Sequence, residues 1–140
     1  MSARSKARKQ SLDLLYEGDI RGQAPADLLA LRDIADDGPD ARPIREYTKE
    51  LILGIADNRR KIDELISTYA QGWDMDRMPP IDRNILRIAI YEILWAADID
   101  LQVACDEAVE LAKSLSTDES AGYINGVLGR IIKLKDSIAI

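Results

Sequence analysis

The sequence predicts an all-α protein, with about seven helices in one compact domain that spans residues 1–140. Apolar residues recur at spacings of three and four along almost the whole chain, which is the period of an amphipathic helix. No segment shows the alternation of a half-buried strand, and no pair of apolar runs is joined by a hairpin turn. Hydrophobic residues make up 46% of the 140 residues and charged residues 31%, which is typical of a globular domain.

Four helices are expected in the first half of the chain. The first runs over about residues 3–19, and Pro25 suits the first turn of the second. Residues 36–43 combine aspartates, a glycine and two prolines, which predicts a loop. A longer apolar pattern follows, and Gly54 and Asn58 inside it predict a break into two consecutive helices.

Three more helices are expected in the second half. Residues 71–80 cannot be regular helix throughout, because they contain a glycine and a pair of prolines. The next helix, over 81–97, is apolar around so much of its surface that we expect it to be central and nearly surrounded. Asp100 can cap the helix after it, and Thr117 or Asp118 can cap the last one.

The composition removes most of the chemistry that enzymes use. The chain has no histidine, which is the commonest general base and a frequent metal ligand. Its one cysteine, Cys105, stands in an apolar helical pattern, where a small buried side chain fits better than a nucleophile. Residues 122–126 contain two glycines but lack the strand and the lysine of a phosphate-binding loop. We therefore expect no catalysis, no cofactor and no metal site.

The sequence also indicates where the protein works. A single cysteine allows no disulfide within the chain. The basic N-terminus is not followed by the apolar segment of a signal peptide, and no apolar run is long enough to span a membrane. We expect a cytoplasmic protein that does not contact a membrane.

Positive charge is concentrated at the N-terminus. The net charge is -6, yet the chain begins with Arg4, Lys6, Arg8 and Lys9 and no acidic residue among them. On a helix Arg4 and Arg8 are neighbours, and Tyr16 continues their row. Such an edge suits a single strand of RNA, whose phosphates pair with the cations while a base stacks on the ring. Two structural alternatives stay open: a solvated, frayed terminus, and a Tyr16 that belongs to the core.

A second segment, residues 79–87, combines a rigid start with charged residues. Two prolines precede a helical turn that contains Asp82, whose negative charge suits the helix dipole. A functional role and a well-formed helix start both account for this pattern.

The last helix contains polar and glycine residues that lower its stability. Gly126 and Gly129 stand inside an apolar helical pattern, and each interior glycine costs roughly 1 kcal/mol. Such a cost suggests close packing of another helix or close approach of a ligand. Tyr123 and Asn125, near the start of this helix, could stack on a base and hydrogen-bond to it. Helix crossings at the glycines remain the structural alternative.

Taken together, these segments resemble the NusB family of bacterial antitermination factors over essentially the whole chain. Each segment alone is weakly specific, but they occur in the family's order and near its spacing. They are the basic N-terminal helix with Leu15-Tyr16, residues 81–87 followed by Tyr91-Glu92, residues 106–113 and residues 123–128.

The resemblance implies a fold and a function. The fold would be two packed helical sub-bundles. The function would be binding of boxA-type single-stranded RNA in nascent transcripts, as a heterodimer with NusE, a small-subunit ribosomal protein. The pair would join an RNA polymerase complex that resists termination, including on ribosomal RNA operons.

The resemblance also implies site residues. The protein partner would meet the region around the start of the central helix, which includes Asp76 and Asp82. RNA contacts would come from the basic N-terminal helix, the aromatic residue that follows it and the start of the last helix. The RNA-binding positions are Arg4, Lys6, Arg8, Lys9, Tyr16, Tyr69, Tyr123 and Asn125.

Two other functions remain open from the sequence. One is a homo-oligomeric interaction module, in the simplest case a homodimer, without an RNA function. The other is a stand-alone recognition domain of an RNA-modifying system.

Overall fold

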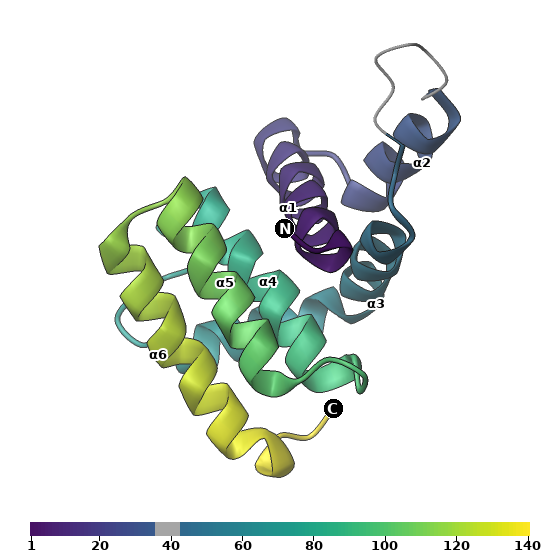
Figure 1. The fold of residues 1–140 in the computed structure, drawn as a ribbon. Helices are drawn as coiled ribbons and strands as arrows, with labels where there is room; N and C mark the ends of the chain where they lie inside the picture. Colours follow the sequence, from purple (N-terminus) through teal and green to yellow (C-terminus); the bar gives the residue numbers. More distant parts are fainter. Residues whose placement is uncertain (36–42) are drawn as a thin grey trace. The chain divides into compact units, whose positions relative to one another are not determined.

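The computed structural model of the protein describes residues 1–35 and 43–140 (Figure 1). Every regular element in these two ranges is a helix, which confirms the predicted all-α class. The predicted loop at 36–43 lies, except for its last residue, outside the described residues. The elements are α1 (Ala3–Arg21), α2 (Pro25–Ala35), α3 (Glu46–Tyr69), α4 (Pro80–Trp95), α5 (Leu101–Leu115), α6 (Asp118–Leu134) and the 3₁₀ helix η1 (Lys135–Ser137).

The chain divides into two compact units, Met1–Asp57 and Asn58–Ile140. The boundary falls inside α3, so this helix contributes its first part to the first unit and the remainder to the second. The first unit also contains α1 and α2, and the second contains α4, α5 and α6.

Helix α1 begins and ends at signals that are local in the sequence. The hydroxyl of Ser2 accepts a hydrogen bond from the backbone N–H of Ser5 at 3.0 Å and caps the N-terminus. At the other end Gly22 has a φ of 66°, the left-handed conformation that glycine adopts without strain. The chain turns closely after the helix, because a Cβ at Gly18 would stand 2.7 Å from the backbone oxygen of Gln23. The predicted first helix is confirmed and runs on to the residue before Gly22.

Helix α3 is continuous over 24 residues, so the break expected at Gly54 and Asn58 is wrong. The apolar face of the helix continues at helical spacing through both positions, and its packing outweighs the roughly 1 kcal/mol that an interior glycine costs. This continuity is why the described part of the chain has six α-helices rather than about seven. The buried side chains of this face are Leu51, Ile52, Ile55, Ile62, Leu65 and Ile66.

Helix α4 is the centre of the second unit. It packs against both α5 and α6, and these two helices pack against each other (Figure 1). Most of its residues are buried, including the polar side chains of Asp82, Asn84, Arg87 and Glu92. The expectation of a central, nearly surrounded helix is confirmed.

The two helices that cover α4 begin at the expected caps. The carboxylate of Asp100 accepts a hydrogen bond from the backbone N–H of Gln102 at 2.9 Å. The hydroxyl of Thr117 accepts one from the backbone N–H of Ser120 at 2.9 Å, so Thr117 rather than Asp118 is the N-cap of α6.

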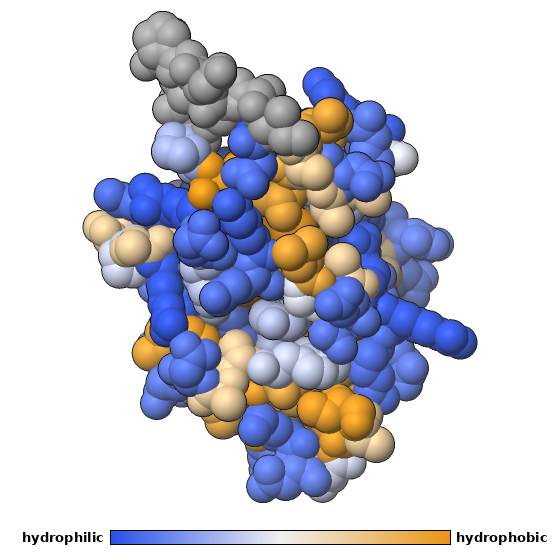
Figure 2. Space-filling model, turned by 90° about the vertical axis from the view of Figure 1, so that its right-hand side faces the viewer, coloured by the Kyte–Doolittle hydropathy of each residue, from blue (hydrophilic) through white to orange (hydrophobic). Residues whose placement is uncertain are grey.

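On the face drawn in Figure 2, hydrophilic residues cover most of the area and hydrophobic residues show as separate patches. None of the helices in residues 1–35 and 43–140 is long and apolar enough to cross a membrane. The same residues contain no group of three histidine, cysteine or acidic side chains that could hold a metal ion.

Candidate nucleic-acid interface

Two arginines of the N-terminal basic cluster share one aromatic ring. The guanidinium carbon of Arg4 lies 5.1 Å from the centre of the Tyr47 ring, and that of Arg8 lies 5.7 Å from it. Both distances are within the range of cation–π attraction. Tyr47 is half-buried and belongs to the first turn of α3. Sequence reasoning missed this residue, because no local pattern connects it with arginines so far away along the chain.

The row predicted as a cationic edge of α1 is exposed only at its two ends. Arg4 is exposed, but Arg8 is only 2% exposed and Leu12 is fully buried. Tyr16 ends the row and is 38% exposed, whereas Leu15 beside it is buried. Tyr16 therefore does not belong to the core, and its side chain is partly open to solvent. Arg8 is the candidate RNA contact that the structure places away from solvent.

The two lysines of the basic cluster lie in different surroundings. The side chain of Lys6 is exposed. The ammonium group of Lys9 donates to both carboxylate oxygens of Asp13 at 3.0 Å, one turn further along α1. Both partners of this ion pair are open to solvent, so it contributes little to stability and can exchange for another anion. Arg4, Lys6 and Lys9 form the solvent-exposed part of the basic cluster.

In the second unit, a tyrosine and a tryptophan meet at the turn that follows α3. The ring centroids of Trp73 and Tyr123 are 4.7 Å apart and the planes meet at 86°, which is an edge-to-face contact. The Tyr123 hydroxyl donates a hydrogen bond to the backbone oxygen of Gln71 at 2.9 Å. Burial raises the pKa of this hydroxyl, and the positive charge of Arg130 partly offsets the rise. The hydroxyl therefore stays protonated and remains a donor at neutral pH.

The candidate Tyr69 is the last residue of α3 and adjoins the same turn. Its side chain is half-buried. Its backbone oxygen accepts a hydrogen bond from the guanidinium of Arg130 at 2.8 Å. The last carbonyl groups of a helix lack partners within the helix, and a cation there also suits the helix dipole. Helix α6 thus brings Tyr123 and Arg130 to the end of α3 and the turn that follows it.

Asn125 is exposed on α6 and also contacts α5. Its side-chain oxygen accepts a hydrogen bond from the Sγ of Cys105 at 3.3 Å. Cys105 is buried, and burial raises the pKa of its thiol, with a smaller contribution from the negative charge of Asp106. The interpretation of Cys105 as a small buried side chain is confirmed.

The glycines of α6 do not lie at helix crossings. A Cβ added at Gly122, Gly126 or Gly129 would meet no atom within 4 Å among the described residues. All three are exposed. The predicted alternative of close helix packing at Gly126 and Gly129 is therefore wrong, and the backbone of α6 is left open to solvent at these positions.

The two carboxylates expected to meet a protein partner lie in opposite environments. Asp76 is exposed in the segment between α3 and α4. Asp82 has no exposed surface, and its carboxylate accepts a hydrogen bond from the hydroxyl of Ser120 at 2.7 Å. Because α6 covers the first turn of α4, direct contact between Asp82 and a partner does not fit this structure. Its contact instead connects α4 with α6.

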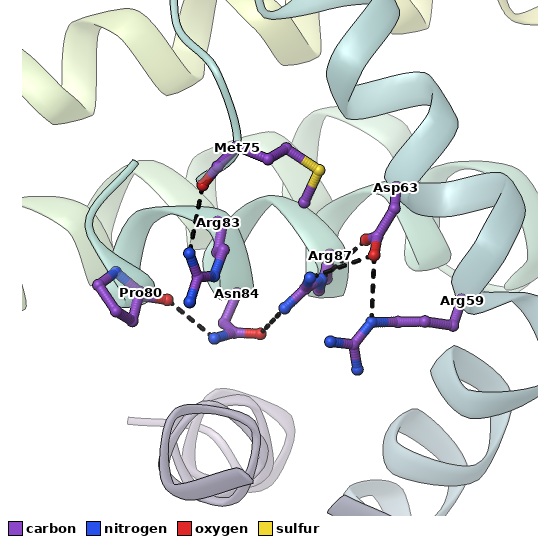
Figure 3. A network of polar contacts seen from close by, with 7 residues as sticks. All are labelled: Arg59, Asp63, Met75, Pro80, Arg83, Asn84 and Arg87. Carbon is purple, nitrogen blue, oxygen red and sulfur yellow. Dashed lines mark hydrogen bonds and ion pairs between the residues drawn. The ribbon is translucent and has the colours of Figure 1, made fainter. Parts of the chain in front are cut away.

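The segment that contains Asp82 also forms a polar network with α3 (Figure 3). The guanidinium of Arg87 donates to both carboxylate oxygens of Asp63, at 2.8 and 3.2 Å, and to the side-chain oxygen of Asn84 at 2.8 Å. Asn84 in turn donates to the backbone oxygen of Pro80 at 2.8 Å. Arg59 adds a weaker contact to Asp63 at 3.3 Å. These contacts favour the structural explanation of residues 79–87, because they hold α4 against the second part of α3.

Comparisons with known proteins agree with this arrangement. The transcription antitermination protein NusB of Saccharopolyspora erythraea is 49% identical over 139 residues, which cover 99% of this chain and 92% of that protein. The protein of the same name from Beutenbergia cavernae is 51% identical over 142 residues, with 96% and 92% covered. Among solved structures, NusB of T. maritima has a TM-score of 0.80 and 34% identity, with 94% of this chain and 92% of that chain covered.

A further solved structure contains partners. It is a crystal structure of the antitermination factors NusB and NusE in complex with double-stranded RNA. The matching chain has a TM-score of 0.76 and 26% identity, with 93% of this chain and 96% of that chain covered. The family model described as the NusB family matches residues 5–133. This is a family of RNA-binding antitermination factors and not of enzymes, and the protein belongs to it.

Proposed function

We propose that the protein is a transcription antitermination factor that binds boxA-type single-stranded RNA together with NusE. In this proposal the protein and NusE join a transcribing RNA polymerase complex and make it resistant to termination, including on ribosomal RNA operons. The observation that carries the proposal is the similarity, over 93% of the chain, to a structure in which NusB and NusE are bound to RNA. That RNA is double-stranded, so the choice of a single strand rests on the exposed rings and cations of this chain.

The N-terminal basic cluster supplies the groups that phosphates require. Arg4, Lys6 and Lys9 are open to solvent on α1. Arg8, which is buried, holds its guanidinium near the ring that Arg4 also approaches. In this proposal Arg4, Lys6 and Lys9 pair with phosphates. Arg8 does not touch the RNA but packs near the Tyr47 ring that Arg4 also contacts.

Aromatic and amide side chains supply the contacts that bases require. Tyr16 is 38% exposed on α1, which suits stacking of an unpaired base. Tyr69, Tyr123 and Asn125 belong to the second unit and reach solvent to different degrees. Stacking on these rings requires splayed bases, which a single strand offers and a paired duplex does not.

Of the two carboxylates expected to meet the protein partner, Asp76 is exposed and can form an intermolecular ion pair, whereas Asp82 is buried. Asp82 acts indirectly in this proposal. Its hydrogen bond to Ser120 holds the start of α4 in place, and Asp76 lies a few residues before that start in the sequence. Neutralising Asp76 should therefore weaken the partner complex without loss of stability, whereas neutralising Asp82 should lower stability first.

Fluorescence anisotropy tests the proposal directly. A labelled boxA-like single strand, a scrambled single strand and a boxA duplex are titrated with the protein, each with and without NusE. We expect selective binding of the boxA single strand that tightens when NusE is present. Equal binding of all three RNAs in both conditions would overturn the proposal.

The alternative of a homo-oligomeric module without RNA function makes the opposite prediction. Light scattering would then give an oligomer whose mass is the same with and without boxA RNA. The antitermination proposal instead requires that RNA and NusE add to the protein, and that any homodimer dissociates when they do. A recognition domain of an RNA-modifying system would bind RNA without any effect of NusE.

A further inference from the structure

We propose that Trp73 stacks on a nucleobase of the bound RNA and that Tyr123 and Arg130 are the residues that position it. This inference rests on the proposed function and adds to it a contact residue that the sequence does not indicate.

The turn that carries Trp73 has a defined backbone. The N–H of Trp73 donates a hydrogen bond to the backbone oxygen of Ala70 at 3.2 Å, which closes a four-residue turn directly after α3. Gly72, at the third position, has a φ of 80°, as in type II turns. Other residues adopt this conformation only with strain. The backbone position from which the indole projects is therefore well defined.

Helix α6 contacts this turn at two points and the last residue of α3 at a third. The Tyr123 hydroxyl donates to the backbone oxygen of Gln71 at 2.9 Å, and the Arg130 guanidinium donates to that of Tyr69 at 2.8 Å. The ring of Tyr123 meets the indole of Trp73 edge to face at 4.7 Å. A turn held in this way loses little conformational entropy when a ligand binds, which is the advantage of preorganisation.

The edge-to-face contact with Tyr123 covers only part of the aromatic surface of the pair. In such a pair the edge of one ring meets one face of the other, so the contact occupies only one of the four ring faces. Trp73 is half-buried, and part of its surface therefore reaches solvent. Bases stack on aromatic side chains of this kind in complexes with single-stranded nucleic acids.

The charges around Trp73 favour a base over a phosphate. The carboxylates of Asp74 and Asp76 follow it in the chain, and both are exposed. They repel phosphates, whereas a stacked base carries no charge. Two exposed cations lie near these carboxylates: Arg77, whose backbone N–H donates to the backbone oxygen of Asp74, and Arg130 of α6. Arg130 can attract the phosphate of a neighbouring nucleotide while it donates to the Tyr69 carbonyl.

The two tryptophans of the chain allow the contact to be observed. In the variant W95F, Trp73 is the only tryptophan. In the variant W73F, the only tryptophan is Trp95, which stacks on Tyr91 of α4 at a centroid distance of 6.2 Å. With boxA-like RNA and NusE present, we expect the emission of W95F to be quenched along the same binding curve as the anisotropy of labelled RNA. The emission of W73F should stay constant.

Affinity measurements give a second readout. W73L should weaken RNA binding about five- to 150-fold, which corresponds to about 1–3 kcal/mol of base stacking at 1.4 kcal/mol per tenfold. The slope of log Kd against log salt should be unchanged, because no cation is lost. W73F keeps an aromatic ring and should lose less affinity. Urea denaturation of W73L and W73F identifies any loss that comes from unfolding.

The outcomes separate this inference from the proposed function. If the unaltered protein binds no RNA by anisotropy, the proposed function fails and the stacking contact fails with it. If the protein binds RNA but the emission of W95F is constant and folded W73L binds with full affinity, only the stacking contact is overturned. Quenching of W95F by NusE alone, with no further change on adding RNA, would also overturn it and assign Trp73 to the protein interface.

Discussion

The guanidinium carbon of Arg4 lies 5.1 Å from the centre of the Tyr47 ring, and Arg8 approaches the same ring from one turn further along α1. The two positively charged side chains of α1 thus contact the same aromatic ring of α3, although their charges repel each other. The ring restricts the long side chain of Arg4, which is otherwise open to solvent. A cation that is restrained before RNA binds loses less entropy on binding.

Replacement of Tyr47 should therefore weaken RNA binding through Arg4. Tyr47→Leu removes the aromatic ring, and we expect an affinity about two- to fivefold lower, which corresponds to about 0.5–1 kcal/mol of cation–π attraction. Tyr47→Phe keeps the ring and should keep most of the affinity. Anisotropy measurements on Tyr47→Leu, Arg4→Ala and the double variant form a mutant cycle. Additive losses in that cycle would show that Tyr47 does not act through Arg4.

The exposed cations of α1 should determine the salt dependence of binding. If Arg4, Lys6 and Lys9 each pair with a phosphate of a single strand, the slope of log affinity against log salt should be about -2. Arg4→Ala and Lys6→Ala should each flatten this slope by about 0.7. Arg8→Ala is the matched control from the same helix, because its buried side chain should affect stability by about 0.5–3 kcal/mol and leave the slope unchanged. A flatter slope in Arg8→Ala would place that guanidinium on the RNA.

Alanine in place of the exposed glycines of α6 should stabilise the protein. Gly126→Ala and Gly129→Ala each remove backbone entropy from the unfolded chain and meet no atom within 4 Å in the described residues. We expect each to raise the free energy of unfolding by about 0.5–1 kcal/mol in urea denaturation. Gly22→Ala is the control of opposite sign, because its φ of 66° strains any side chain by about 1–2 kcal/mol. A loss of stability in Gly126→Ala would contradict the open surroundings of α6.

The ion pair between Arg87 and Asp63 should contribute strongly to the stability of the second unit. Arg87 is 5% exposed, and Asp63→Asn removes the charge that faces its guanidinium. Loss of hydrogen bonds to a charged group should lower the free energy of unfolding by about 1.5–3 kcal/mol. Arg59→Met serves as the comparison, because its contact to Asp63 is longer, at 3.3 Å, and both side chains are about one-third exposed, so less than about 1 kcal/mol is expected from that contact. Equal effects of the two variants would show that burial of Arg87 adds nothing.

Features that depend on neighbouring residues were predictable from the sequence, and those that depend on distant residues were not. The first helix, expected over about residues 3–19, and the caps at Asp100 and Thr117 follow from local patterns and hydrogen bonding, and all three are confirmed. The break expected at Gly54 was wrong, because the packing of an apolar face overrides the propensity of one glycine.

The same distinction applies to the candidate site. The basic cluster and Tyr16 are visible in the sequence as a helical row, but the row does not reveal that Arg8 is buried. Tyr47 and Trp73 were missed, because their partners lie far along the chain and are brought to them only by folding. The RNA-binding and partner-binding roles of the site residues remain predictions for the experiments described above.

The buried thiol of Cys105 has a consequence for how the protein responds to its surroundings. Histidine and cysteine are the side chains that most readily gain or lose charge near neutrality. The chain has no histidine, and burial moves the pKa of its single cysteine further from neutrality. Neither histidine nor cysteine therefore changes its charge in this protein when the pH varies around neutrality. Ionic strength still acts on its exposed charges, because dissolved salt screens them.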